Sequence, residues 1–335
     1  MNYFQQKLTV CYLGNFTKDT IKYINKTNSI KETIGGSVYF GLKVIRHFFP
    51  NIYVQIHSNG LPKDLVITEN ISLVNHRKNS NREENFYDSS NTLTHFLLEY
   101  VGNERKLYLK FYDEHKLDIT KDMFNKNPDV LFVVPIFHEI SEDTIISFHR
   151  LFPDCLIASD FQGWLRTSGN MEIKQRKWKP SVEFINSLSV IKVSVDDLKS
   201  YSKKEIKTYI QSLLIDKNKI ISITGGEKGS LTIMMNNFNT FENLFWYYCP
   251  AVKIDTNLDS TGAGDVWLTT FTLLIKQTSE IILALATATI IATLHIQSET
   301  GSFLYENLIS VQKMIENQKK AITRIEFENG INKFF

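Results

Sequence analysis

Short apolar runs of strand length alternate along this chain with longer segments that have helical periodicity. The first run, LTVCYLG, is followed by IGGSVYFGLKVIRHFF, whose apolar residues recur at the spacing of one helical face: Val38, Leu42, Ile45 and Phe49. A second short apolar run, IYVQIHS, comes next. Strand, helix and strand in this order predict a parallel α/β unit, in which helices cover a mostly parallel sheet.

The alternation resumes in the second half of the chain and predicts further elements of both kinds. Strands are expected at 129–137, 156–161, 190–195 and 219–224, with two edge strands at 231–237 and 243–255. Helices are expected at 141–152, 196–214, 264–277, 279–298 and 308–325. No internal repeat or low-complexity linker divides the 335 residues. We therefore expect one α/β domain over residues 1–335.

The stretch between residues 92 and 120 has a different pattern of apolar and polar residues. Within it, KLYLKFYDE alternates apolar and polar residues, and VGNER has the composition of a turn between two strands. This pattern is typical of an antiparallel hairpin, which need not join a parallel sheet. We expect a small sheet that stands off the main domain.

Composition and charge exclude several classes of protein. Apolar residues make up 43% and charged residues 22%, and a net charge of +2 gives no basic footprint for nucleic acid. Three cysteines form no CxxC pair, and Cys11 and Cys155 beside apolar runs are expected to be buried free thiols. The N-terminal residues lack the layout of a signal peptide, and the longest apolar stretch, 281–294, is too short to cross a bilayer. We expect a soluble, cytoplasmic protein without membrane or nucleic-acid partners.

A glycine-rich turn, DSTGAGD at 259–265, stands directly before the apolar run VWLTTFTLLI. If that run begins a helix, the turn lies at the helix N-terminus, where backbone N–H groups lack partners and favour an anion. Asp265 would then lie in the first turn. A plain helix cap, in which Asp265 only complements the helix dipole, is the alternative. The chain has no P-loop and no GxGxxG after a strand, so any nucleotide chemistry must use another phosphate-binding motif. The turn at 259–265 is the candidate for that motif.

The turn DSTGAGD resembles the signature of the ribokinase (PfkB) family of sugar and nucleoside kinases, and further segments resemble that family in the expected order. LGNFTKD at 13–19 is similar to the first strand with its substrate-binding aspartate, and GGSVYFGL at 35–42 is similar to the glycine pair. THFLLEYVGNERKLYL resembles the lid strands, DFQGWLR at 160–166 a segment of the inositol-kinase-like branch, and ITGGEKGS the turn beside the nucleotide. The resemblance implies a ribokinase-like fold, a mostly parallel sheet flanked by helices, with a small β-sheet lid from about 17–33 and 92–120.

The resemblance also implies a reaction. In this family the aspartate of GAGD takes the proton of the acceptor hydroxyl, and the amides of the turn hold the transferred phosphoryl group. By resemblance, Asp265 is the general base, and the anion hole is formed by the N–H groups of Gly262, Ala263 and Gly264. The expected enzyme is a carbohydrate or polyol kinase that moves the γ-phosphoryl group of ATP, with Mg²⁺, to a hydroxyl of a small sugar or polyol, an inositol-like acceptor being favoured.

Binding residues follow from the same resemblance. The expected substrate-binding residues are Asp19, Gly35, Gly36 and Arg166. The expected residues on the nucleotide side are Thr224, Gly226, Gly229 and Ser194. Asp197 is expected to reach the water shell of the metal. Ser194 and Asp197 stand where the family has Asn and Glu, and an ordinary helix N-cap with first-turn acids is the alternative for them.

The expected substrate pocket departs from the family pattern, which leaves the acceptor open. Val38, Tyr39 and Phe40 follow the glycine pair where the family often has an asparagine. After GAGD, where small residues are usual, this chain has Trp267 and the pair Thr269 and Thr270. A nucleoside kinase of the same family is one alternative, and a non-catalytic ribokinase-like binding or regulatory protein is another. The missing dinucleotide fingerprint disfavours an oxidoreductase. The expected partners are a small sugar or polyol and ATP, and a homodimer through the lid strands remains open.

Overall fold

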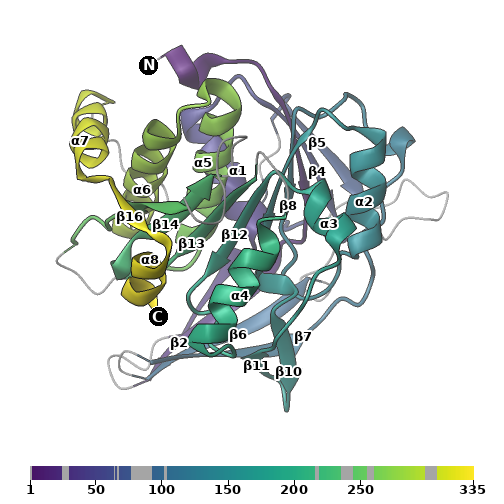
Figure 1. Cartoon of the computed structure of the whole chain (residues 1–335). Coiled ribbons are helices and arrows are strands. Elements are labelled where there is room, and N and C mark those ends of the chain that lie inside the picture. The colour runs from purple at the N-terminus through teal and green to yellow at the C-terminus, as the bar shows by residue number, and fades with distance from the viewer. Residues whose placement is uncertain are drawn as a thin grey trace.

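The structure is a computed structural model, which describes residues 2–24, 30–63, 65, 68–76, 93–101, 104–215, 219–234, 244–254, 260–298 and 308–335. Among these residues, ten strands form one large sheet in the order β16-β15-β14-β13-β12-β9-β8-β1-β4-β5 (Figure 1). The strands from β13 to β5 are parallel, and β14, β15 and β16 extend the sheet in antiparallel fashion.

The bounds of the main-sheet strands follow the apolar runs of the sequence. The parallel strands are β1 (Thr9–Leu13), β4 (Tyr53–Ser58), β5 (Ile71–Asn75), β8 (Val130–Val133), β9 (Leu156–Asp160), β12 (Val190–Ser194) and β13 (Ile220–Thr224). The antiparallel strands are β14 (Ser230–Met234), β15 (Phe245–Cys249) and β16 (Thr323–Glu326).

Helices cover both faces of this sheet, and each face buries its own apolar core (Figure 1). One face packs on α1 (Ser37–Phe48), α5 (Ala263–Thr278), α6 (Ile281–Gln297) and α7 (Leu308–Ala321). The other packs on α2 (Glu142–Leu151), α3 (Val182–Ser187), α4 (Lys203–Leu213) and α8 (Phe327–Phe334). Strand β1 shows the alternation that makes this possible, since Val10 and Tyr12 join the first core while Cys11 and Leu13 join the second.

A second sheet of six strands lies apart from the main sheet, in the order β10-β11-β7-β6-β2-β3. Its strands are β2 (Thr17–Ile24), β3 (Ile30–Gly35), β6 (Thr94–Val101), β7 (Glu104–Phe111), β10 (Arg166–Gly169) and β11 (Glu172–Gln175). Ile21, Phe96 and Leu98 of this sheet pack with Ile136, which follows β8. We call this sheet the lid.

The predicted α/β fold, with a mostly parallel sheet between helices and a small second sheet, is confirmed. The segments expected as lid strands, 17–33 and 92–120, contain β2, β6, β7 and most of β3, although 25–29, 92 and 102–103 lie outside the described residues. The sequence did not reveal β10 and β11, because this short hairpin has no apolar alternation of its own.

Two predicted helices have different bounds in the structure. The helix expected over 196–214 begins only at Lys203, because Ser202 and Glu205 form a capping box that ends the helix on its N-terminal side. The helix expected over 308–325 ends at Ala321, and the chain continues as β16 and α8. Strand β15, which was expected at an edge of the sheet, is therefore covered by β16, where Arg324 lies 4.5 Å above the ring of Phe245.

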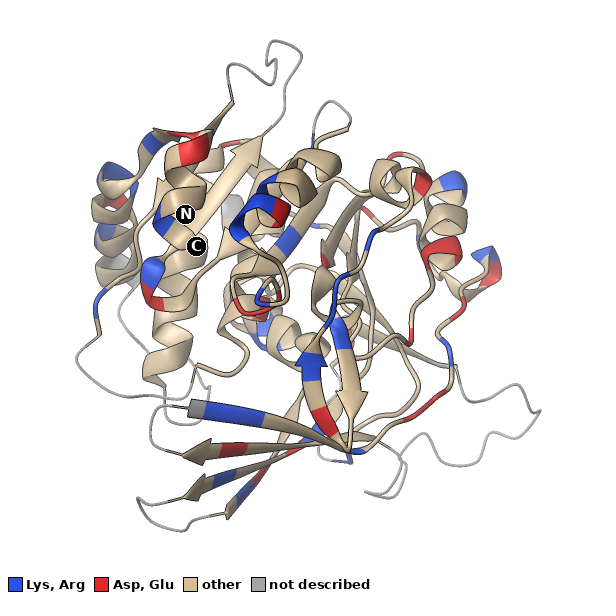
Figure 2. Cartoon of the chain, turned by 60° about the horizontal axis from the view of Figure 1, so that its bottom comes forward, with Lys and Arg blue, Asp and Glu red and all other residues tan. Residues whose placement is uncertain are grey.

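Lys and Arg positions alternate with Asp and Glu positions along the helices and the lid strands (Figure 2). This distribution agrees with the low net charge of the sequence. No helix in the described part of the chain is both long and apolar enough to cross a membrane. All three cysteines are free and buried, as expected for Cys11 and Cys155.

Candidate active site

The candidate site lies at the carboxyl ends of the parallel strands. Strand β1 has β4 on one side and β8 on the other, so the chain order reverses beside β1, and open α/β sheets bind ligands at such a point. The chain leaves β1 at this end and continues directly into the lid strand β2. Helix α5 begins close by, since its second residue, Gly264, packs against the ammonium group of Lys192 of β12.

The glycine turn stands at the N-terminus of α5, as the sequence predicts. Gly262 has φ of 81°, a left-handed conformation that glycine adopts without strain. A Cβ at this position would also overlap the ring of Phe40, which packs directly against Gly262. The N–H of Ala263 donates to the carbonyl of Ser260, 3.1 Å away, so Gly262 and Gly264 are left as the candidates for anion binding. Asp259, at the start of the motif, lies outside the described residues.

Asp265 lies in the first turn of α5 and is hydrogen-bonded by the hydroxyl of Ser37 from α1. Burial raises the pKa of Asp265 from 3.8 to about 6; the charge of Lys192 opposes this rise and that of Asp160 adds to it. A carboxyl group with a pKa near 6 is ionised at neutral pH and can take up a proton there. The site therefore holds a carboxylate suited to proton transfer.

A buried ion pair lies beside Asp265. The Nζ atom of Lys192 is 2.6 Å from Oδ2 of Asp160, and the two side chains are only 4% and 3% exposed. Burial opposes the charge of Lys192, but the nearby carboxylates outweigh burial and raise the pKa of the ammonium group above its usual value. The lysine therefore stays charged in the interior.

Ser194 and Asp197 contact each other at the end of β12. One carboxylate oxygen of Asp197 accepts hydrogen bonds from the backbone N–H and the hydroxyl of Ser194, at 2.9 and 2.6 Å. Burial and the charge of Asp160 raise the pKa of Asp197. No group of three His, Cys, Asp or Glu residues that could hold a metal ion occurs in the described ranges.

Arg166, the first residue of β10, is buried below the lid. Its Nη1 donates to the carbonyl of Ile136, 3.0 Å away, and its guanidinium group lies 5.7 Å from the ring centre of Phe96. Within the part of the chain that the structure describes, its buried Nε has no hydrogen-bond partner. The residue thus brings a positive charge and a donor to the space between the lid and the main sheet.

Three of the predicted substrate-binding residues, Asp19, Gly35 and Gly36, meet where β2 and β3 pair. Asp19 accepts a hydrogen bond from the Thr17 hydroxyl at 2.8 Å, and a Cβ at Gly35 would overlap the Asp19 carboxylate. Gly36 has φ of 89° and a Cβ there would collide with the carbonyl of Asn15. Both glycines are therefore required by close approach, and Ser37 directly after them links this corner to Asp265.

The turn predicted for the nucleotide side follows β13. Thr224 is the last residue of β13 and pairs in register with Ser194 of β12. Gly226 and Gly229 both have positive φ, of 56° and 85°, and a Cβ at Gly229 would collide with the carbonyl of Cys249. The turn places its backbone at the same end of the sheet as Asp197.

The structure thus brings every predicted site residue to the carboxyl ends of the strands or to the adjoining lid. Sequence reasoning missed four residues that touch the same site: Ser37, Phe40 as a packing partner of Gly262, Asp160 and Lys192. The motif DFQGWLR contains Asp160, and a lysine inside the apolar strand VIKVS was the signal that could have revealed the pair.

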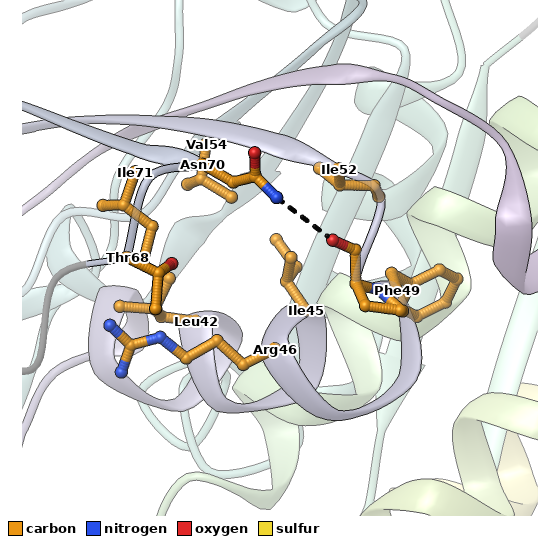
Figure 3. Close-up of a pocket in the computed structure, with 10 residues that line it drawn as sticks. Leu42, Ile45, Arg46, Phe49, Ile52, Val54, Thr68, Asn70 and Ile71 are labelled. Atoms are coloured by element: carbon orange, nitrogen blue, oxygen red, sulfur yellow. Dashed lines mark hydrogen bonds between the residues drawn. The ribbon is translucent and has the colours of Figure 1, made fainter.

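A cavity of about 330 Å³ lies elsewhere, between α1 and the strands β4 and β5 (Figure 3). Its walls are mainly apolar, with Leu42, Ile45 and Phe49 on the helix side. On the far wall Asn70 donates to the carbonyl of Pro50, 3.4 Å away (Figure 3). None of the predicted site residues lines this cavity, and we do not assign the reaction to it.

Known proteins resemble this chain in structure. No protein-family model and no curated protein matches its sequence. A pyrophosphate-dependent kinase of the ribokinase family, in complex with sulfate, matches with a TM-score of 0.64 and 16% identity over 86% of this chain and 95% of its own. Such a kinase in complex with a pyrophosphate analog and myo-inositol matches with a TM-score of 0.60 and 17% identity, over 86% of this chain and 95% of its own. The Arabidopsis thaliana ribokinase with ribose and ATP matches with a TM-score of 0.62 and 12% identity, over 93% and 99%.

Architecture and site together define an α/β protein with a β lid over the carboxyl ends of a parallel sheet. The fold is that of the ribokinase family of kinases, which confirms the resemblance seen in the sequence. At these identities the likeness establishes the fold, and the activity has to be argued from the site.

Proposed function

We propose that this protein is a ribokinase-like phosphotransferase that moves the γ-phosphoryl group of ATP to a hydroxyl of a small sugar or polyol, with an inositol-like acceptor favoured. The observation that carries the proposal is the position of Asp265 in the first turn of α5, three residues after the left-handed Gly262. A plain helix cap has no need of a half-buried carboxyl group whose pKa is raised to about 6.

Asp265 is the proposed general base. It takes the proton of the acceptor hydroxyl while the hydroxyl oxygen forms a bond to the γ-phosphorus and the bond from that phosphorus to the ADP oxygen breaks. ADP leaves with the electron pair of that bond, and Asp265 later releases its proton to solvent. The hydroxyl of Ser37 lowers the pKa of the Asp265 carboxyl group and so favours its ionised, proton-accepting form.

The N-terminus of α5 supplies the proposed anion hole. The N–H groups of Gly262 and Gly264, with the positive end of the helix dipole, stabilise charge on the transferred phosphoryl group. These groups are fixed before the reaction, because Phe40 packs on Gly262 and the Lys192 ammonium group packs beside Gly264. The positive charge of Arg166 between lid and sheet adds to the same effect.

The acceptor is proposed to bind between the lid and the main sheet. Asp19 supplies a carboxylate whose position is fixed by the hydrogen bond from Thr17 and by the close approach of Gly35. Carboxylates accept hydrogen bonds from vicinal hydroxyls, which suits a polyol or sugar. One structural neighbour was solved with myo-inositol and another with ribose, which supports this class of acceptor.

The donor is proposed to lie over the turn formed by Thr224, Gly226 and Gly229, next to Ser194. A Mg²⁺ ion would be carried by the donor phosphates, with Asp197 reaching its water shell, because the described residues offer no cluster of three ligands. When bound, the ion would neutralise phosphate charge. Pyrophosphate is the rival donor, since three of the structural neighbours are pyrophosphate-dependent kinases or variants of one.

The test is phosphoryl transfer measured over a panel of inositols, hexoses, pentoses and nucleosides, each with Mg-ATP and with Mg-pyrophosphate. Asp265→Asn is expected to lower turnover by a factor of about 10² to 10⁴. Asp143→Asn is the matched control, because Asp143 is also a first-turn acid of a helix, but is exposed on α2. Its turnover is expected to equal that of the unchanged protein.

Three results would change the proposal. Equal turnover in Asp265→Asn and Asp143→Asn would remove Asp265 from the chemistry. Turnover with pyrophosphate alone would keep the phosphotransferase and replace the donor. Thermal stabilisation by a sugar or by ATP, without turnover on any acceptor, would favour the binding protein instead.

A further inference from the structure

The ammonium group of Lys192 lies in an unusual position for a lysine. Residue 192 is in the interior of β12, a central strand, and pairs in register with Asp160 at the end of β9. The pairing places Nζ 2.6 Å from Oδ2 of Asp160, with both side chains almost fully buried. A buried charge is costly unless it is paired, so the position of this ammonium group is tightly fixed by its partner.

The same ammonium group packs against the N-terminus of α5. A Cβ on Gly264 would come within 2.8 Å of Nζ of Lys192, so the ammonium group occupies the space that a side chain at 264 would need. The next residue along the helix is Asp265. A cation in this position is adjacent to both the proposed anion hole and the proposed base.

Other charged and polar groups also face Asp265, each from a different element. Ser37 donates from α1, Arg166 contributes a positive charge from β10, and Asp160 a negative charge from β9. Tyr12 of β1 lies near through its hydrogen bond to Thr269, and Asp197 acts on Lys192 from the turn after β12. From α6, His295 is hydrogen-bonded to the carbonyl of Thr261.

We propose that Lys192, anchored by Asp160, is a positioning residue that holds the Asp265 carboxyl in its ionised, proton-accepting form. The proposal rests on the proposed function only for the role of Asp265 as base. The Lys192 ammonium group packs against Gly264 at the N-terminus of α5, and its ion pair with Asp160 holds it in that place. The charge of Asp160 opposes that of Lys192 at Asp265, so the two members of the pair must act on Asp265 in opposite directions.

The opposite signs give a test that does not depend on activity. The carboxyl ¹³C shifts of ¹³C-aspartate-labelled protein are titrated, and the Asp265 signal is assigned by its loss in Asp265→Asn. In Lys192→Met the pKa of Asp265 is expected to rise by about one unit or more, and in Asp160→Asn it is expected to fall. Unchanged values in both variants would overturn the proposal.

Lys219 offers the matched control. It is also almost fully buried, but it precedes β13 at the opposite end of the strands, where its Nζ donates to the carbonyls of Ile185 and Leu188. Lys219→Met removes a buried ammonium group without changing the charges around Asp265. It is expected to lower the melting temperature and leave the pKa of Asp265 unchanged. An equal rise in Lys192→Met and Lys219→Met would show a general loss of packing and overturn the proposal.

If Lys192→Met does not fold, the double variant Asp160→Asn with Lys192→Met removes both buried charges and leaves neither unpaired. The pKa of Asp265 is then expected to lie above that of the unchanged protein, because the influence of Lys192 exceeds that of Asp160. A value at or below that of the unchanged protein would overturn the proposal. If no acceptor is ever turned over, the titration still decides the role of Lys192, so the two failures are distinguishable.

Discussion

The hydroxyl of Ser37, the first residue of α1, donates a hydrogen bond to the carboxylate of Asp265 in the first turn of α5. Two glycine turns far apart in the sequence are thereby joined, because Ser37 directly follows Gly35 and Gly36. The bond favours the ionised carboxylate and so lowers the pKa of Asp265 against the effect of burial.

Ser37→Ala is expected to raise the pKa of Asp265, because the ionised form loses a hydrogen-bond donor. The acid limb of kcat/KM should therefore move to higher pH, and kcat/KM at pH 6 should fall about threefold to tenfold. Ser212→Ala is the control, since its hydroxyl donates to the carbonyl of Tyr209 within α4, away from the site. A limb that moves equally in both variants would contradict the role of Ser37.

The pH dependence of the proposed reaction follows from Asp265 itself. Its pKa of about 6 means that the base is ionised above pH 6 and protonated below it. We expect kcat/KM to be level above about pH 7 and to fall about tenfold per pH unit below pH 6. Asp265→Asn should abolish this limb in the residual activity. A limb that persists in the variant would belong to another group.

The ionisation of Asp265 should favour activity but lower the free energy of unfolding. The folded-state pKa lies above the usual 3.8, so the folded protein binds an extra proton between about pH 4 and pH 6, and stability falls as pH rises through that window. The pKa rise to about 6 corresponds to a loss of about 3 kcal/mol of unfolding free energy. Because the Asp265 side chain is partly exposed, we expect a smaller loss, of about 1 to 2 kcal/mol.

Asp265→Asn is therefore expected to be more stable than the unchanged protein at pH 7 to 8, with the gain shrinking to nothing near pH 4. Urea unfolding at several pH values measures it. Asp143→Asn should show no such gain, since Asp143 is exposed in the first turn of α2 and favours the helix dipole. A variant at 265 that is less stable at every pH would refute the expectation.

Gly262→Ala should lower both stability and activity. An alanine at φ of 81° is strained, and its Cβ would overlap the ring of Phe40. We expect a loss of about 2 to 4 kcal/mol of unfolding free energy. Gly169→Ala in the lid hairpin, where a Cβ meets nothing within 4 Å, should lie within about 0.5 kcal/mol of the unchanged protein. Equal losses of unfolding free energy in Gly262→Ala and Gly169→Ala would show that neither the left-handed backbone nor the contact with Phe40 requires glycine at 262.

Gly35→Ala should act on the acceptor and not on the donor. The new Cβ would displace the Asp19 carboxylate from its place beside Thr17. We expect kcat/KM for the acceptor to fall about 10- to 100-fold, mainly through KM, while KM for the donor stays constant. A rise in the KM of the donor alone would contradict the assignment of Gly35 to the acceptor side of the site. Gly169→Ala again serves as control.

The glycine turns could be predicted from the sequence because their signal is local. Gly262 and Gly36 need positive φ, and each precedes an apolar helical run, so turn and helix identify one another. The position of Asp265 in the first helical turn follows from the same few residues. Six of the seven parallel strands were equally visible, because strands buried on both faces are continuous apolar runs, whereas the edge strand β5 (Ile71–Asn75) was not predicted.

The pairing of Lys192 with Asp160 could not be predicted, because it depends on the register between β12 and β9. Neither residue alone indicates a buried ion pair, and only the pairing of the two strands brings their charged atoms within 2.6 Å of each other. The C-terminal strand β16 was missed for a related reason. Its four residues continue the helical pattern of α7, and the unpaired edge of β15 decides their conformation instead.

The antiparallel edge of the main sheet is completed late in synthesis. Strand β15 carries the residues FWYYC, and its outer edge pairs only with β16, while α5, α6 and α7 are made between them. During translation the outer edge of β15 therefore stays unpaired for a time on the order of seconds, and it can pair with strand edges of other chains. The yield of folded protein should therefore be limited by what shields β15 during that interval, before Trp246 can stack on Phe327 of α8.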